Sequence, residues 1–257
     1  MKDLKRFVRI AQGKEKAELV LKNAQVFHSF TGEFNKCDIA IADGRVAGVG
    51  SYVGEREIDL SGKYITPGFI DGHVHIESSM LSPLEFGKVV AAAGTTAVVA
   101  DPHEIANVAG LEGIRYMIKA SENIPIRAYF MLPSCVPATP LEDSGAKLLA
   151  DDLMSLLDEK KVLGLAEMMN APGVLMGDQS VYDKLKMAEG YRIDGHAPGL
   201  RGEALMGYAA AGIHSDHECV TAEEALERLR AGMYLLIREG SAAKNLRALL
   251  PVINEMT

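Results

Sequence analysis

The sequence predicts an α/β protein built on a (β/α)8 barrel of the TIM type and preceded by a small β module. From residue 64 on, short apolar runs alternate with amphipathic stretches, the pattern of parallel strands joined by helices. The apolar runs end in histidines and carboxylates, and barrels place their active sites at that end of the strands. A doubly wound open sheet is the alternative, but the first run lacks a glycine-rich nucleotide-binding fingerprint and the chain has no phosphate-binding loop.

Composition narrows the possible partners and the compartment. The net charge of −8 over 257 residues gives no electrostatic reason to expect nucleic acid or an anionic membrane. The longest apolar runs, such as residues 88–100, are shorter than the roughly 20 residues that span a membrane. The N-terminus is charged throughout, unlike a signal peptide. Three scattered cysteines argue against a disulfide framework. We therefore expect a cytoplasmic protein.

The N-terminal part, residues 1–66, reads as a helix followed by the small β module. A polar amphipathic helix is predicted over residues 2–18. The next 45 residues or so hold short alternating runs separated by turn signals at residues 31–32 and 43–44. This pattern predicts a small antiparallel module, a partial composite β domain with too few strands to close a sandwich alone.

Residues 67–257 are assigned to the barrel, with a first strand that starts slightly earlier, and seven strand–helix units are countable. The predicted strands lie at residues 64–76, 95–104, 125–135, 161–170, 191–199, 213–220 and 233–240. The predicted helices lie at residues 83–94, 107–122, 146–160, 180–190, 202–212, 221–232 and 242–256. Ser82 and Pro83 mark the start of the first helix. The eighth unit of a barrel is missing from the sequence, so we expect a barrel truncated before strand 8.

Polar residues at the strand ends predict a metal site. They are His73 and His75, Asp101, His103 and Glu104, Glu167, Asp194 and His196, and Asp216, His217 and Glu218. Residues i and i+2 of a strand point the same way, so His73 and His75 can bind one ion. Imidazole and carboxylate ligands suit zinc, iron or manganese. Glu167 ends an apolar run, where a buried carboxylate is costly unless it is paired or bound to a metal.

Taken singly, these residues have simpler interpretations. A lone His-x-His is more often incidental, and residues 77–79 could merely cap the following helix. His214 is out of phase with His217, so we interpret it as structural, and His28 as a surface residue. The whole set, in chain order and at the strand ends, is what predicts the metal site.

The motifs also carry a family resemblance. The chain has His-Val-His-Ile-Glu-Ser-Ser at residues 73–79, Ala-Asp-Pro-His-Glu-Ile-Ala-Asn at residues 100–107 and Ser-Asp-His-Glu at residues 215–218. In these stretches, and over nearly its full length, it resembles the bacterial adenine deaminases of the amidohydrolase superfamily. The resemblance implies hydrolytic deamination of adenine to hypoxanthine and ammonia, in purine salvage, by a hydroxide that two divalent ions (manganese, iron or zinc) activate.

Carried onto this sequence, the resemblance implies that His73 and His75 bind one metal and His196 and His217 the second. Glu167 bridges them, and Glu167 and His217 are the catalytic residues. Substrate-binding or proton-relay roles are assigned to Glu77, Asp101, His103, Glu104 and Glu218.

The family also supplies an aspartate from strand eight, which this sequence lacks. The chain therefore resembles the N-terminal portion of a longer enzyme, which we expect to act on adenine as a homo-oligomer.

Two other functions stay open. One is another amidohydrolase reaction, such as cyclic-amide hydrolysis, but those enzymes bridge their metals with a carboxylated lysine. Here Glu167 holds the bridging position, and Lys160 and Lys161 precede the strand. The other is a catalytically incomplete metal-binding fragment that needs a second chain. A deaminase built on His-x-Glu and Pro-Cys-x-x-Cys is excluded, because residues 133–138 lack the second thiol.

Overall fold

The computed structural model describes residues 3–139 and 141–254, which form two compact units. The first unit extends to Gly68 and the second begins at Phe69, two residues beyond the boundary expected from the sequence. The seventh predicted helix, residues 242–256, runs partly outside the described residues.

The first unit contains a short helix and five strands. The helix α1 (Leu4–Ala11) is shorter than predicted: Gly13 adopts the left-handed conformation (φ 70°), and β1 starts at Ala17. Asp3 caps the helix by accepting a hydrogen bond from the N–H of Arg6 at 3.0 Å. The strands are β1 (Ala17–His28), β2 (Glu33–Ala42), β3 (Arg45–Gly50), β4 (Gly54–Asp59) and β5 (Tyr64–Ile65).

The sheet of this unit is mixed, which corrects the prediction of an antiparallel module. Strand order is β3-β2-β1-β4, with β2 antiparallel to both β1 and β3. However, β4 pairs parallel to the first half of β1 and β5 parallel to its second half. Turn signals predict hairpins between neighbouring strands, but they carry no information on the crossover that returns the chain to the far edge of β1.

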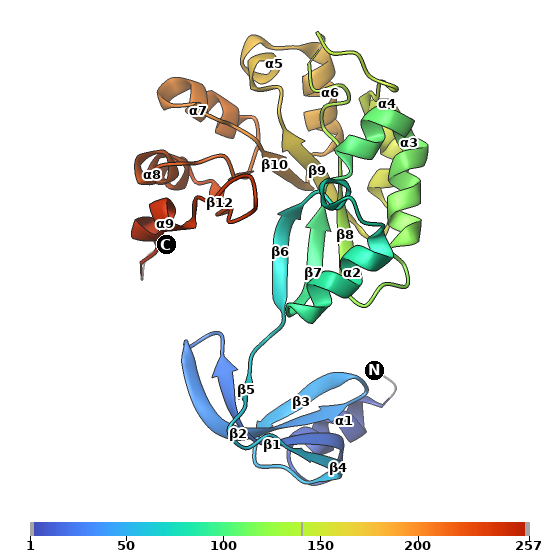
Figure 1. Ribbon diagram of the computed structural model, residues 1–257, viewed down its shortest axis with the longest axis vertical. Coiled ribbons are helices and arrows are strands. Elements are labelled where there is room, and N and C mark those ends of the chain that lie inside the picture. The colour runs from blue at the N-terminus through green and yellow to red at the C-terminus, as the bar shows by residue number, and fades with distance from the viewer. Residues whose placement is uncertain (1–2, 140, 255–257) are drawn as a thin grey trace. The chain divides into compact units, whose positions relative to one another are not determined.

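The second unit contains seven parallel-type strands within the described residues. They are β6 (Phe69–Val74), β7 (Thr95–Ala100), β8 (Arg127–Leu132), β9 (Val162–Met168), β10 (Arg192–Gly195), β11 (Ser215–Asp216) and β12 (Tyr234–Leu235). Neighbours in β6 to β10 follow the order of the chain and all pair parallel (Figure 1). This order confirms the barrel prediction, since a doubly wound sheet reverses its strand order at a switch point.

Helices connect these strands. They are η1 (Glu77–Ser79), α2 (Pro83–Ala92), α3 (His103–Ala120), α4 (Ala150–Leu157), α5 (Ala171–Met176), α6 (Gln179–Met187), α7 (Gly202–Ala210), α8 (Ala222–Arg230), α9 (Leu246–Leu249) and η2 (Leu250–Val252). As expected, Ser82 caps α2. The sequence did not predict α5, because Pro172 reads as a breaker, yet proline is tolerated in a first helical turn. In the described part of the helix predicted over residues 242–256, four residues form α9 and the next three form η2.

Helix α3 is broken at Gly110, where φ is 59°. A Cβ at this position would lie 3.2 Å from the Cβ of Ala146. The first segment of α3 therefore ends at Ala109, and it carries His103 on its first turn.

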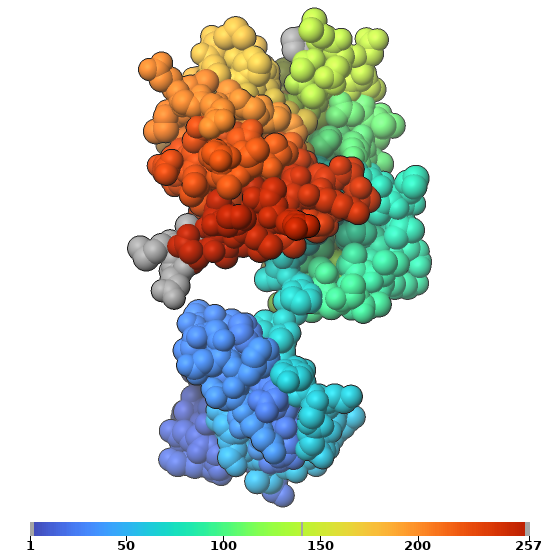
Figure 2. Space-filling view, turned by 60° about the vertical axis from the view of Figure 1, so that its left-hand side comes forward, coloured from blue at the N-terminus to red at the C-terminus, as the bar shows by residue number. Residues whose placement is uncertain are grey.

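The core of the second unit lies between the strands and the helices outside them. Val98, Phe130 and Leu165 of the strands are fully buried with Ile114 of α3 and Leu153 of α4. A smaller cluster between α8 and α9, which lie side by side in Figure 1, contains Cys219, Ala225, Leu249 and Val252. This part of the chain forms the orange and red surface in Figure 2. Among the described residues, no helix is long and apolar enough to cross a membrane.

Candidate active site

The strand ends bring five histidines around one carboxylate. Glu167, next to the end of β9, is 3% exposed, so its side chain is almost entirely removed from water. The histidines come from four other segments of the chain: His73 and His75 from β6 and the residue after it, His103 from α3, His196 after β10, and His217 after β11. These are the five histidines that the sequence placed at strand ends.

The two oxygens of Glu167 divide these histidines into two groups. Oε1 lies 3.3 Å from His75 Nε2, 3.5 Å from His103 Nδ1 and 3.8 Å from His73 Nε2. We call His73, His75 and His103 the Oε1 histidines. Oε2 lies 2.7 Å from His196 Nδ1 and 3.2 Å from His217 Nε2, and we call these two the Oε2 histidines.

Ring nitrogens within each group also face one another. His73 Nε2 lies 3.2 Å from His75 Nε2, and His196 Nδ1 lies 3.4 Å from His217 Nε2. In each facing pair only one nitrogen can donate a proton to the other, so the other nitrogen presents a lone pair. These lone pairs point into the space beside Glu167. Neutral imidazole and carboxylate are the ligands that zinc, iron and manganese take in proteins. The residues therefore fit a divalent transition-metal centre.

The carboxylate and the histidines shift one another's pKa. Burial opposes ionisation of Glu167, but hydrogen bonds from His196, His217 and His75 lower its pKa far below the usual value. Burial together with the charge of His217 lowers the pKa of His73 to about 3. Burial also disfavours the charged form of His75, yet its hydrogen bond to Glu167 and its interactions with Asp101 together outweigh this and raise the pKa to about 9. Glu167 is thus an anion in the centre of the site.

Buried hydrogen bonds hold the backbone of β9 behind this carboxylate. The Ser134 hydroxyl donates to the carbonyl of Glu167 at 2.5 Å, and Lys184 Nζ donates to the carbonyl of Ser134 at 2.8 Å. The Tyr208 hydroxyl donates to the carbonyl of Met168 at 2.6 Å and accepts the N–H of His196 at 2.9 Å. These bonds fix Glu167 and His196 relative to each other.

A fully buried ion pair joins the two loops that carry the Oε2 histidines. Arg228 Nε donates to Asp216 Oδ2 at 2.8 Å, and its Nη2 donates to the carbonyl of Ala197 at 2.6 Å. Asp216 Oδ1 accepts the N–H of Ala197 at 3.1 Å and of Glu218 at 3.0 Å. The pair therefore orders the residues next to His196 and His217 without reaching Glu167 itself.

Glu218 lies at the edge of the Oε2 histidines. Its Oε1 is 3.4 Å from His217 Nε2 and 3.5 Å from His196 Nδ1. Arg238, just after β12, binds both oxygens of Glu218 at 2.6 and 2.9 Å. This bidentate contact fixes the orientation of the carboxylate.

The other predicted site residues divide between the cluster and the start of α3. Asp101 Oδ2 lies 3.0 Å from His103 Nδ1, inside the cluster. Glu77 accepts the N–H of Ile105 at 3.2 Å, and Glu104 accepts the hydroxyl of Ser78 at 2.5 Å. These contacts of Glu77 and Glu104 are the capping and loop bonds of the simpler interpretation, and their substrate-binding roles stay a prediction.

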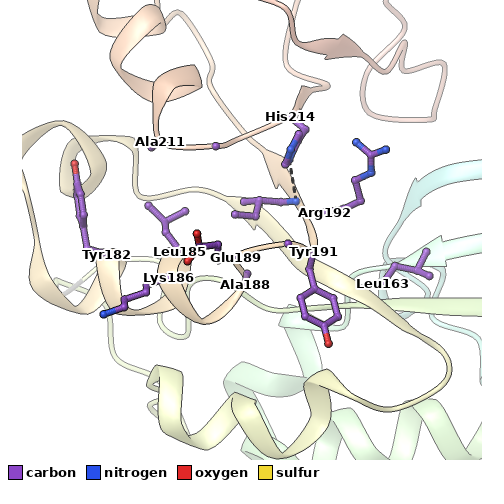
Figure 3. Close-up of a pocket in the computed structure, with 13 residues that line it drawn as sticks. Leu163, Tyr182, Leu185, Lys186, Ala188, Glu189, Tyr191, Arg192, Ala211 and His214 are labelled. Atoms are coloured by element: carbon purple, nitrogen blue, oxygen red, sulfur yellow. Dashed lines mark hydrogen bonds between the residues drawn. The ribbon is translucent and has the colours of Figure 1, made fainter.

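The two remaining histidines lie elsewhere. His214 lines a cavity of about 740 Å³ at the start of β9 and β10 (Figure 3). Glu167 lies at the other end of β9. The Nδ1 atom of His214 accepts the N–H of Ile193 at 3.3 Å. His28 ends β1 in the first unit. Lys161, just before β9, donates to the carbonyl of Ser121 at 2.9 Å, away from the bridging position.

Two arginines of this site were missed from the sequence, although each had a signal. Arg228 lies three residues after Ala225, on the buried face of α8. Arg238 lies at the end of the seventh predicted strand, and most of the other predicted strands carry histidines or carboxylates at that end. Ser134, Lys184 and Tyr208 gave no comparable signal, because their role depends on contacts between distant segments.

The chain is similar to proteins of the amidohydrolase family. Residues 64–250 match the model of the amidohydrolase family. "Adenine deaminase 2" of Carboxydothermus hydrogenoformans is 58% identical over 257 residues, which is 100% of this chain and 45% of that protein. "Adenine deaminase" of Clostridium acetobutylicum is 54% identical over 95% of this chain and 43% of its own length. The chain thus spans less than half the length of these curated relatives.

Solved structures share the fold at low identity. N-acyl-D-glutamate deacylase of Bordetella bronchiseptica, solved with zinc and a phosphonate inhibitor, superposes with a TM-score of 0.61 at 18% identity, over 87% of this chain and 58% of that one. A triazine hydrolase from Arthrobacter gives a TM-score of 0.59 at 15% identity, over 88% of this chain and 72% of its own.

Proposed function

Because this chain belongs to the amidohydrolase family, we propose that it carries the two-metal centre of an enzyme that deaminates adenine. Adenine and water would give hypoxanthine and ammonia. The observation that carries the proposal is the single buried carboxylate with histidines on both of its oxygens. The names of the relatives at 54–58% identity supply the substrate.

The residues of the cluster would hold two divalent ions, for which manganese, iron and zinc are the candidates. His73 and His75 would bind one ion, His196 and His217 the other, and Glu167 both. When bound, such ions lower the pKa of a water and so supply a nucleophile near neutral pH. The chain's own contribution is a rigid, largely buried carboxylate bridge that Ser134 supports from behind.

Carboxylates and two histidines in and around the cluster would orient adenine and move protons. Glu218 is held at the rim by Arg238, and the Oε2 atom of Glu77 is buried without a hydrogen-bond partner among the described residues. An acceptor at either position suits the amino and ring N–H groups of a purine. His217, Asp101, His103 and Glu104 are the further candidates for proton transfer.

The compartment and the assembly are part of the same proposal. Cys37, Cys135 and Cys219 are free thiols, the state that a reducing cytosol maintains, so we place the enzyme in the cytoplasm. A homo-oligomer is the proposed assembly, which light scattering after gel filtration would test.

Activity is tested with the protein expressed from its complete reading frame and loaded with Mn²⁺. Adenine should be converted to equal amounts of hypoxanthine and ammonia, measured by chromatography and an ammonia assay. Glu167→Gln should lower kcat by at least about 1,000-fold, since both ions depend on this side chain, and His214→Gln should leave it unchanged. A metal-loaded protein that ignores adenine but opens a cyclic amide would contradict the proposal.

A further inference from the structure

We propose that Asp101 and His103 bind a divalent transition-metal cation directly, beside Glu167. His75 is a further ligand of this cation, which is the ion that His73 and His75 share in the proposed two-metal centre. The inference deepens the proposed function and rests on it in one respect, since His75 and Glu167 belong to the proposed two-metal centre. It moves Asp101 and His103 from substrate contacts or proton relays to metal ligands.

The ligand atoms have the spacing that one cation requires. With metal–ligand bonds of about 2.1 Å, neighbouring ligand atoms of a tetrahedral or octahedral site lie about 3.0–3.4 Å apart. Asp101 Oδ2 lies 3.0 Å from His103 Nδ1, and Glu167 Oε1 lies 3.3 Å from His75 Nε2 and 3.5 Å from His103 Nδ1. One ligand atom from each of the four residues falls within 4.8 Å of the others.

Asp101 supplies the independent observation. The residue is 1% exposed, and its Oδ1 atom is buried without a hydrogen-bond partner among the described residues. An unpartnered buried carboxylate oxygen costs free energy unless a cation or donor compensates it. A cation that Asp101 binds through both carboxylate oxygens would supply the missing partner of Oδ1.

The surrounding structure orients both histidines for this role. The carbonyl oxygen of Asp101 lies 3.0 Å from His75 Nδ1, so that His75 can donate there and direct Nε2 at Glu167. Asn107 donates to the carbonyl of His103 at 2.8 Å, one turn along α3. The break at Gly110 separates the segment of α3 that carries His103 from the rest of the helix.

The competing interpretation is that Asp101 only orients His103. In that arrangement Nδ1 of His103 keeps its proton, donates to Asp101 and binds no metal. The two interpretations differ in one measurable property, the affinity of the first cation for a chain that lacks the His103 imidazole or the Asp101 charge.

The test is a metal titration of the metal-free chain, without substrate. Zn²⁺ is titrated against a chromophoric chelator into wild type, His103→Gln, Asp101→Asn and the control His214→Gln, with circular dichroism to verify folding. Wild type and control should bind two equivalents. Each site variant should keep one equivalent at wild-type affinity and bind the other more than about 100-fold more weakly, beyond the loss of about 10–100-fold that follows when a residue only orients a ligand.

The outcomes separate this inference from the proposed function. Two equivalents that both bind within about 100-fold of wild-type affinity in both site variants would overturn the inference alone, because a residue that only orients a ligand causes a loss of that size. A wild-type chain that binds no Zn²⁺ would overturn the metal-dependent function as well. Should the variants fail to fold, anomalous diffraction from zinc-soaked wild-type crystals decides: the inference requires a zinc peak within about 2.2 Å of His103 Nδ1.

Discussion

Asp38 in the β module and Glu167 in the second unit are both buried carboxylates on strands, with 6% and 3% of their surface exposed. Their surroundings differ completely. Asp38 Oδ2 accepts from Lys22 Nζ at 2.6 Å and from the N–H of Tyr52 at 3.2 Å, and its Oδ1 accepts from the N–H of Asn23 at 3.0 Å. Glu167 instead faces five imidazoles.

The difference shows how to tell a carboxylate that stabilises the fold from one that serves chemistry. An ammonium at neutral pH and an amide N–H always donate, so Asp38 is satisfied as it stands. An imidazole nitrogen can be a donor or a lone pair, and the nitrogens around Glu167 also face one another. Lone pairs that face one another do not stabilise the fold. A cation bound between them would compensate for their repulsion.

The largest effect on stability is expected at a carboxylate of the second unit that, like Asp38, stabilises the fold. Asp216 is such a residue, since Arg228 and two backbone N–H groups satisfy it. Arg228→Met should lower the free energy of unfolding by about 3–5 kcal/mol, because it leaves Asp216 buried and unpaired. Urea unfolding monitored by circular dichroism measures this. A loss below about 1 kcal/mol would contradict the assignment of Arg228 and Asp216 as an ion pair that stabilises the fold.

A smaller effect is expected at Asp38 itself. Asp38→Asn should lower the free energy of unfolding by about 1–3 kcal/mol, because hydrogen bonds to a charged group are lost while the partly exposed Lys22 keeps access to water. Metal binding should not change. A variant that loses affinity for Zn²⁺ would remove the distinction between the two carboxylates.

The smallest expected effect is the pH dependence of the stability difference between wild type and Asp38→Asn. Burial raises the pKa of Asp38, but hydrogen bonds from Lys22 and from backbone N–H groups together lower it by more than burial raises it. The net shift of the pKa is therefore downward. The stabilisation is therefore present above the unfolded pKa of about 3.9 and is lost as the pH falls through the folded pKa. The stability gap between wild type and Asp38→Asn should narrow below about pH 4. A gap that is constant down to about pH 3 would contradict this assignment.

The sequence predicted the parts of the site that depend on local periodicity. His73 and His75 are two residues apart on a strand, and Glu167 ends an apolar run, so their direction follows from the strand alone. The seven strands and most helices were likewise predicted, because their apolar pattern repeats with a clear period.

The features that the sequence does not predict depend on contacts between distant segments of the chain. The grouping of His103 with His75 requires the turn between β7 and α3 to bring the first residue of that helix against Glu167. The support of Glu167 by Ser134 and Lys184 joins residues 33 and 50 positions apart. The parallel pairing of β4 and β5 with β1 depends in the same way on how the chain crosses the sheet.

The central claim is that Glu167 is the shared ligand of two cations, and metal content tests it most directly. Wild type and Glu167→Gln are loaded with Zn²⁺, freed of unbound metal by gel filtration and analysed by mass spectrometry of the elements. We expect two zinc ions per wild-type chain and none that survives filtration in Glu167→Gln, with both chains folded. Two zinc ions retained by Glu167→Gln would contradict the account.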